Sequence, residues 1–125
     1  SLELVLDPLI SVTAPDGALA LMVKPQFEVG KDRVGKGGVV RDPAMRAEAV
    51  ASVADAAARR GWGAVAVTTS PLPGPSGNVE FFLLLRRGEP RITHEEIASE
   101  VRRRLGPRRA SFEPKTFVLS ARPSR

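Results

Sequence analysis

Two residues, Lys24 and Glu80, have the types and positions that acid–base chemistry needs. Lys24 directly follows an unbroken apolar run at residues 18–23, and open α/β sheets bind their ligands at the C-terminal ends of such strands. Glu80 is the third residue of a strand expected at residues 78–87, where a buried carboxylate requires a partner. If these strands are antiparallel neighbours, both side chains meet at one edge of the sheet. The residues alone allow two other interpretations: Lys24 is a strand-end lysine whose amine reaches solvent, or Lys24 and Glu80 form a purely structural ion pair.

A glycine-rich stretch after the first strand supplies further candidates. Residues 30–36, GKDRVGK, match the GxxxxGK part of a phosphate-binding loop, but Gly37 stands where that motif has a magnesium-binding serine or threonine. The stretch also does not lead straight into a helix. We therefore interpret residues 25–41 as a flexible loop, or as a mobile loop over a substrate site. His94 lies in the capping box THEE and is interpreted as structural.

The composition excludes several classes of protein. The chain has 125 residues, one histidine and no cysteine, which excludes a disulfide scaffold and a thiolate zinc site. The single histidine argues against a histidine-rich metal site or a Ser-His-Asp triad, and we expect no metal ligands. No apolar run approaches the ~18 residues of a membrane-spanning helix.

The net charge of +5 is concentrated in the C-terminal part of the chain. Residues 1–85 contain 8 Lys or Arg and 9 Asp or Glu, whereas residues 86–125 contain 11 and 5. A basic C-terminal stretch of this kind is compatible with nucleic-acid binding. It therefore supports one functional hypothesis, a non-catalytic RNA-binding module.

The hydrophobic pattern predicts alternating helices and strands. Pro8 either kinks the first helix or begins it. A proline-rich turn occupies residues 70–77. The expected helices cover residues 1–12, 43–60 and 93–105, and the expected strands cover residues 18–23, 64–69 and 78–87.

This order of elements predicts the second half of an open α/β sheet. The last two strands are joined by a short turn and can pair as a hairpin, while strands joined through a helix should be parallel. We expect residues 1–88 to form this half-sheet. Residues 89–125 are expected to form a basic helix that leans only weakly on the core, followed by a tail.

Three segments in this order resemble the TlyA family. They are VKPQFE at residues 23–28, GKGGVVRDP at residues 35–43, and SP at residues 70–71 followed by GNVEF at residues 77–81. TlyA proteins are known as hemolysins and as ribosomal RNA 2′-O-methyltransferases of the FtsJ-like superfamily. The resemblance covers residues 1–88. It implies a Rossmann-like methyltransferase sheet in which the last strand lies antiparallel between the other two.

The resemblance also implies a reaction and its residues. FtsJ-like enzymes transfer a methyl group from S-adenosylmethionine to a ribose 2′-hydroxyl with a Lys-Asp-Lys-Glu set. Lys24 matches the second lysine of this set, and Glu80 matches the glutamate. The lysine would accept the hydroxyl proton and the glutamate would orient the amines. The implied partner is ribosomal RNA or a ribosomal subunit, and the implied location is the cytoplasm.

The other half of this set and the glycine-rich cofactor loop would precede Ser1. We therefore expect a C-terminal fragment of a methyltransferase, inactive alone, with no cofactor-binding residues of its own. The basic RNA-binding module remains the alternative. A membrane-active hemolysin is disfavoured because the only amphipathic helix, at residues 93–105, is short.

Overall fold

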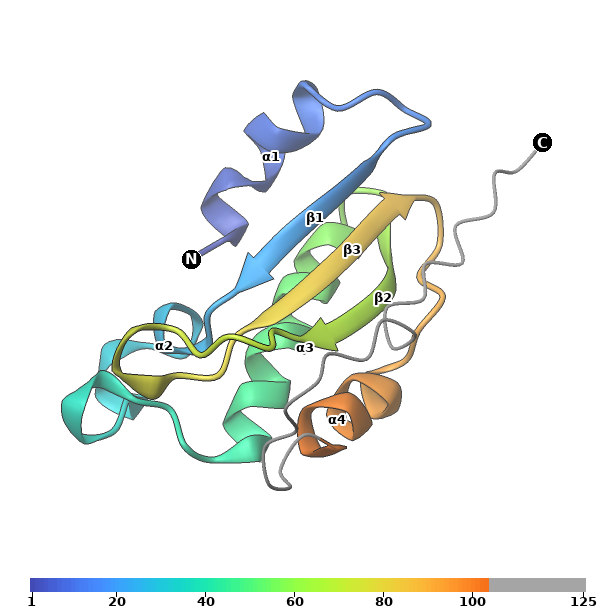
Figure 1. Ribbon diagram of the computed structural model, residues 1–125. Coiled ribbons are helices and arrows are strands. Elements are labelled where there is room, and N and C mark those ends of the chain that lie inside the picture. Colours follow the sequence, from blue (N-terminus) through green and yellow to red (C-terminus); the bar gives the residue numbers. More distant parts are fainter. Residues whose placement is uncertain (104–125) are drawn as a thin grey trace.

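The computed structural model describes residues 1–103 of the chain (Figure 1). The expected end of the last helix near Leu105 and the basic tail lie outside the described residues. The strands are β1 (Ala18–Val23), β2 (Trp62–Thr69) and β3 (Phe81–Arg87); the helices are α1 (Glu3–Ser11), α2 (Pro25–Glu28), α3 (Pro43–Ala58) and α4 (His94–Arg103).

The three strands form one sheet in the order β1-β3-β2, and β3 is antiparallel to both neighbours. The predicted fold class, with the last strand between the other two, is confirmed. The register pairs Val23 with Phe81 at one end of β1 and Ala18 with Arg86 at the other. β3 begins at Phe81, so Glu80 precedes the strand and is not its third residue as expected. The reason is that the chain before Phe81 bonds to the preceding loop instead of to β1.

The hydrophobic core lies between the sheet and helices α1, α3 and α4. Alternate residues of β1 and β3 point to this side, which is the period of two expected for a strand with one buried face. In Figure 1, α3 runs behind the sheet. The largest fully buried side chains of the core are those of Leu6, Val23, Val50, Val53, Phe81, Leu83, Leu85, Ile97 and Val101.

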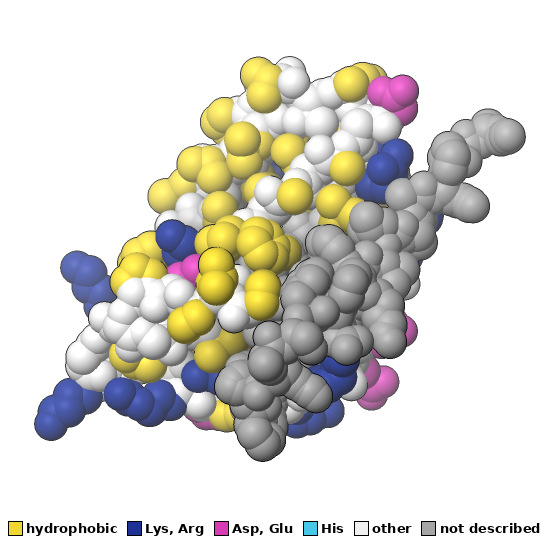
Figure 2. Space-filling model, in the orientation of Figure 1, with side chains coloured by type: hydrophobic (Ala, Val, Ile, Leu, Met, Phe, Trp, Pro, Cys, Tyr) yellow, Lys and Arg dark blue, Asp and Glu magenta, His cyan; other side chains and the backbone are white. Residues whose placement is uncertain are grey.

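The opposite face of the sheet is less well covered. Met22, Phe82 and Thr68 lie side by side on it because Phe82 pairs with both of the others. Met22 is exposed, and Figure 2 shows hydrophobic side chains across the middle of this face.

Helix α4 packs more closely than the sequence suggested. Ile97 and Val101 are 1% and 2% exposed and belong to the main core, so the expectation of weak contact was wrong. A narrow apolar stripe is enough to attach α4 to the core, because the side chains of Ile97 and Val101 are both buried. The carboxylate of Glu100 also accepts hydrogen bonds from the backbone N–H and hydroxyl of Thr69, at 3.0 and 3.1 Å. His94 pairs with Asp55 of α3 at 2.8 Å, in agreement with a structural role.

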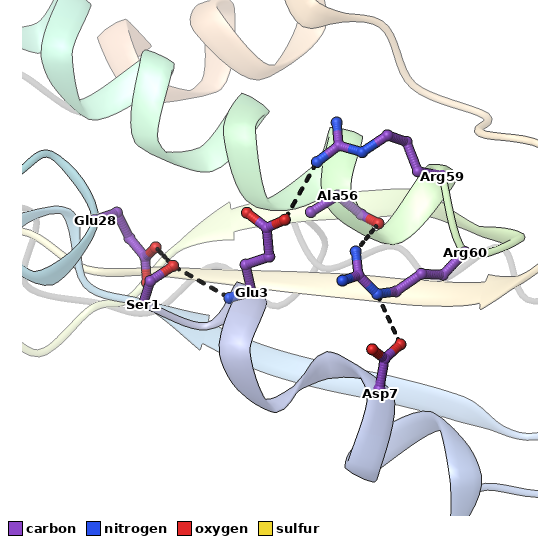
Figure 3. A network of polar contacts seen from close by, with 7 residues as sticks. All are labelled: Ser1, Glu3, Asp7, Glu28, Ala56, Arg59 and Arg60. Carbon is purple, nitrogen blue, oxygen red and sulfur yellow. Dashed lines mark hydrogen bonds and ion pairs between the residues drawn. The ribbon is translucent and has the colours of Figure 1, made fainter.

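The N-terminal helix is tied to two other elements (Figure 3). Arg60 at the end of α3 bonds to Asp7 of α1 at 2.8 Å. The hydroxyl of Ser1 donates to Glu28 of α2 and accepts from the backbone N–H of Glu3. Pro8 lies inside α1, which already begins at Glu3, so the helix does not start at the proline.

The stretch at residues 25–41 contains short helical turns and is not without structure. Pro25 occupies the first position of α2, where its fixed φ angle and missing N–H are tolerated. Two 3-10 turns follow, η1 (Lys31–Arg33) and η2 (Lys36–Gly38). Gly37 adopts a φ of 75°, a conformation that favours glycine. Asp42 then caps α3 through the N–H of Ala44, as the sequence predicts.

Candidate active site at the sheet edge of Lys24 and Glu80

The strand register brings Lys24 and Glu80 to the same end of the sheet, where β1 ends and β3 begins. Val23 and Phe81 are the last paired residues of β1 and β3. Lys24 follows Val23 and Glu80 precedes Phe81, so both lie one residue beyond the last pair of the ladder. Two residues far apart in the sequence are thereby brought to the same end of the sheet.

Lys24 is half-buried at the junction of β1 and α2. Its backbone is extended, and its ammonium nitrogen lies 5.7 Å from the centroid of the Phe27 ring, within cation–π range. Within residues 1–103, no ion pair joins Lys24 to Glu80. The structure therefore does not support the interpretation of these residues as a structural ion pair, and the lysine amine remains available.

Glu80 is a buried carboxylate with little direct support. Its side chain is 5% exposed, and one hydrogen bond reaches it, from Nε2 of Gln26 at a long 3.4 Å. The other amide atom, Oε1 of Gln26, is buried without a hydrogen-bond partner among the described residues. Buried polar atoms are usually satisfied, and the exceptions concentrate at functional sites. This end of the sheet thus holds the carboxylate of Glu80 and the amide oxygen of Gln26, and both can accept hydrogen bonds.

The loop between β2 and β3 holds Glu80 in place. The backbone N–H of Ser70 donates to the carbonyl of Glu80 at 2.8 Å, and the N–H of Gly74 donates to the carbonyl of Asn78 at 2.8 Å. A Cβ atom at Gly74 would collide with the carboxylate of Glu80. Only glycine at this position leaves room for the carboxylate where it lies.

Asn78 is a residue of this site that the sequence reasoning did not single out. Its side chain is 2% exposed; Oδ1 accepts from the N–H of Val40 at 3.0 Å, and Nδ2 donates to the carbonyl of Gly38 at 2.9 Å. It therefore fastens the glycine-rich stretch to the chain two residues before Glu80. The dipeptide Gly77-Asn78 is typical of an ordinary turn, so the sequence carried no signal for this role.

An exposed ion pair fixes the glycine-rich stretch at its other end. The guanidinium of Arg33 donates two hydrogen bonds to the carboxylate of Glu48 in α3, at 2.8 and 2.9 Å. The hydrogen bond and the opposite charge lower the pKa of Glu48 and raise the pKa of Arg33. Residues 30–36 thus form turns held against α3, and they do not lead into a helix as a phosphate-binding loop does.

The three-stranded sheet and its flanking helices define a mixed α/β fold, and comparison with known proteins identifies the family. The profile of the FtsJ-like methyltransferase family matches residues 1–87. The chain belongs to this family.

Several relatives share the matched region. The chain is 56% identical over 86 residues to the 16S/23S rRNA (cytidine-2′-O)-methyltransferase TlyA of Mycobacterium tuberculosis, covering 69% of this chain and 32% of the relative. It is 35% identical over 60 residues to Hemolysin A of Brachyspira hyodysenteriae, covering 48% and 25%. The chain therefore spans about a third or less of the length of these curated relatives.

Two solved structures have the same fold. A candidate hemolysin from Lactococcus lactis superposes with a TM-score of 0.71 at 33% identity, over 79% of this chain and 50% of its own. A second, from Streptococcus thermophilus, superposes with a TM-score of 0.77 at 28% identity, over 82% and 38%. No helix within residues 1–103 is long and apolar enough to cross a membrane.

Proposed function

We propose that this chain supplies part of the catalytic centre of an rRNA 2′-O-methyltransferase, with Lys24 and Glu80 as its catalytic residues. The supporting observation is the register of β1 and β3, which brings Lys24 and Glu80 to the same end of the sheet within the region matched by the methyltransferase family. The activity carried in the name of the Mycobacterium tuberculosis relative supports the choice of substrate. The expected partner is ribosomal RNA, and the expected location is the cytoplasm.

In this proposal Lys24 handles the proton of the ribose hydroxyl. A 2′-hydroxyl becomes a good nucleophile only when its proton has an acceptor, and the neutral form of a lysine amine can serve. Lys24 is half-buried, and its amine forms no ion pair among residues 1–103. The proton moves from the hydroxyl oxygen to Nζ of Lys24.

Glu80 has an orienting role in the same proposal. Its carboxylate is held by Gln26 and by the space that Gly74 leaves. A buried acceptor at a fixed place can orient an amine or a hydroxyl donor, which reduces the entropy cost of reaching the reactive geometry. The unpartnered Oε1 of Gln26 provides a second acceptor beside it.

The methyl donor that the family implies is S-adenosylmethionine, but the described residues do not fit a complete site for it. Their glycine-rich segment follows α2, whereas a nucleotide-type site places such a segment between a strand and the helix it leads into. The hydrogen-bond acceptors described at this end of the sheet are the carboxylate of Glu80 and the amide oxygen of Gln26. No step of the mechanism is therefore assigned to binding of this cofactor by residues 1–103.

The test is a chimeric enzyme in which this chain replaces the matched segment of the Mycobacterium tuberculosis relative. Transfer of labelled methyl groups from S-adenosylmethionine to rRNA is measured for the chimera and for its Lys24→Ala and Glu80→Gln variants. Lys24→Ala should lower the rate about 10²- to 10⁴-fold, the range for loss of a general base. Arg87→Ala is the control, because Arg87 is an exposed cation at the opposite end of the sheet.

Full activity of the Lys24→Ala chimera would remove Lys24 from the catalytic role. The 125-residue chain alone is expected neither to bind S-adenosylmethionine nor to methylate rRNA. Micromolar binding in a calorimetric titration of the chain alone would contradict that expectation.

A further inference from the structure

Positive charge gathers at one corner of the molecule, beside the candidate active site. Residues 24–41, here called the cationic segment, contain five Lys or Arg and two Asp or Glu. Figure 2 shows Lys and Arg side chains projecting at the corner where Figure 1 places α2 and the turns that follow it. Within residues 1–103, Lys31 and Lys36 are exposed and form no ion pair. Their charges are thus available to a ligand.

The cationic segment is held at a fixed place relative to Glu80. Asn78 bonds to the backbone of Gly38 and Val40, and Arg33 bonds to Glu48 of α3. Arg41 donates to the carbonyl of Lys36 at 3.4 Å. The exposed lysines therefore extend from an anchored backbone, and a ligand that they bind does not have to order the loop first.

The cationic segment also carries an exposed aromatic ring, that of Phe27, whose centroid lies 5.7 Å from the ammonium nitrogen of Lys24. Phe27 of α2 is 62% exposed, although Pro25 in the same helix is buried. An exposed phenylalanine beside cations is the pattern of a single-stranded RNA surface, where bases stack on aromatic rings and lysines contact phosphates. A folded RNA helix offers no free base for such stacking.

We propose that the cationic segment binds single-stranded RNA, with Lys31 and Lys36 at phosphates and the ring of Phe27 stacked on a base. This inference rests on the proposed function, because it concerns the substrate of that same site. It differs from RNA binding through the basic stretch at residues 86–125. Of the arginines in α4, Arg103 is already paired with Glu100 at 3.1 Å.

The two kinds of contact predict different salt dependence, which a titration can separate. Fluorescence anisotropy of a labelled single-stranded RNA is measured with the 125-residue chain between about 50 and 200 mM salt. The double variant Lys31→Gln, Lys36→Gln should bind more weakly and lower the log–log salt slope by about 1.4, which is ~0.7 for each phosphate contact. Phe27→Ala should weaken binding about 5- to 100-fold with the slope unchanged, because stacking releases no counterions.

Matched variants control for charge and for exposed apolar area. Arg87→Gln with Arg102→Gln removes two exposed cations from the basic stretch, and Val12→Ala shortens an exposed apolar residue at the far end of α1. Both should change the affinity less than about twofold. Phe27→Trp should retain binding, since indole also stacks on bases.

The inference is overturned if the lysine variant binds RNA as the unaltered chain does, or if the arginine control loses as much affinity as the lysine variant. An unchanged affinity of Phe27→Ala overturns the stacking contact. In these cases the unaltered chain still binds RNA, and the proposed function stands. If the unaltered chain binds no RNA even at low salt, this inference is overturned, whereas the proposed function is decided separately by methyl transfer in the chimeric enzyme.

Discussion

The two ends of the three-stranded sheet each hold a glycine that has no room for a side chain, and different groups fill the space. At the start of β2, a Cβ atom on Gly63 would collide with the backbone of Glu89 and Pro90. At the other end, a Cβ atom on Gly74 would collide with the carboxylate of Glu80. Displacing the backbone at Glu89 and Pro90 disturbs the neighbouring hydrogen bond from Arg91 to Ala64, whereas a carboxylate can rotate about its side-chain bonds.

This difference separates an end of the sheet where backbone packs on backbone from an end where the backbone packs on a buried carboxylate. At the Gly63 end, the chain leading to α4 bonds to the strand region through Gly88 to Gly61 and Arg91 to Ala64, both at 2.8 Å. At the Gly74 end lie Asn78 and Glu80, the two buried polar or charged side chains among residues 1–103. Buried polar groups are costly unless they are hydrogen-bonded; Asn78 has two such bonds, whereas the carboxylate of Glu80 has one long bond from Gln26 among residues 1–103.

The largest expected effect on stability is that of Gly63→Ala. The added methyl group must displace the backbone at Glu89 and Pro90, and overpacking of this kind costs up to about 3 kcal/mol. Urea denaturation followed by circular dichroism measures the change in the free energy of unfolding.

Gly74→Ala is the matched control at the other end of the sheet. Rotation of the Glu80 side chain relieves the contact, so the stability loss should stay below about 1.5 kcal/mol, the cost of a poor rotamer. In the chimeric enzyme, however, Gly74→Ala should reduce methyl transfer about as much as Glu80→Gln. Equal stability losses for the two alanine variants would show that the ends do not differ as described.

Asn78→Ala should have an intermediate effect. It leaves the buried N–H of Val40 and the carbonyl of Gly38 without their partner, which costs about 1–3 kcal/mol. Asn78→Asp should cost at least as much, because its carboxylate can accept from Val40 but has no donor for the carbonyl of Gly38 and places a charge in a buried position. Urea denaturation followed by circular dichroism again measures the change in the free energy of unfolding. If Asn78→Ala unfolds at the same urea concentration as the unaltered chain, the side chain does not fasten the cationic segment.

The smallest expected effect is a slight pH dependence from the ion pair of Arg33 and Glu48. The pKa of Glu48 is lower in the folded protein than its ordinary value of 4.5, so the pair stabilises the fold above about pH 4.5. This contribution disappears as the pH falls through the lower, folded-state pKa. Both side chains are exposed to solvent, which screens their attraction strongly.

Thermal unfolding of the unaltered chain and of Glu48→Gln tests this small effect. The two proteins should differ slightly at pH 7 and converge on acidification below pH 4.5. A difference that grows on acidification would contradict the assignment. Attraction between Arg33 and Glu48 would then not account for the stability difference between the two proteins.

Much of the fold could be predicted from sequence because its signals are local. The apolar runs of the strands, the N-cap at Asp42 and the capping box of α4 are read within a few residues, and the structure confirms each of them. The position of α4 was harder to predict. Its burial depends on Ile97 and Val101 meeting α3 and β2, which are distant in sequence.

The candidate site was only partly predictable for the same reason. Lys24 and Glu80 were chosen by their place at strand ends and by a family resemblance, and their catalytic roles stay predictions. Asn78 and Gln26 were not chosen, because a turn asparagine and a glutamine after proline are common and their contacts join segments far apart in the chain.

The sequence by itself determined which segments form strands and helices, because caps, turns and side-chain periodicity act between near neighbours. The tertiary structure decided which of these elements lie side by side and where β3 begins. Placing β3 between β1 and β2 brings Lys24 and Glu80 to the same end of the sheet and Asn78 to Gly38. That arrangement follows from burying Phe81, Leu83 and Leu85 against the helices, a requirement of the whole core that no short segment contains.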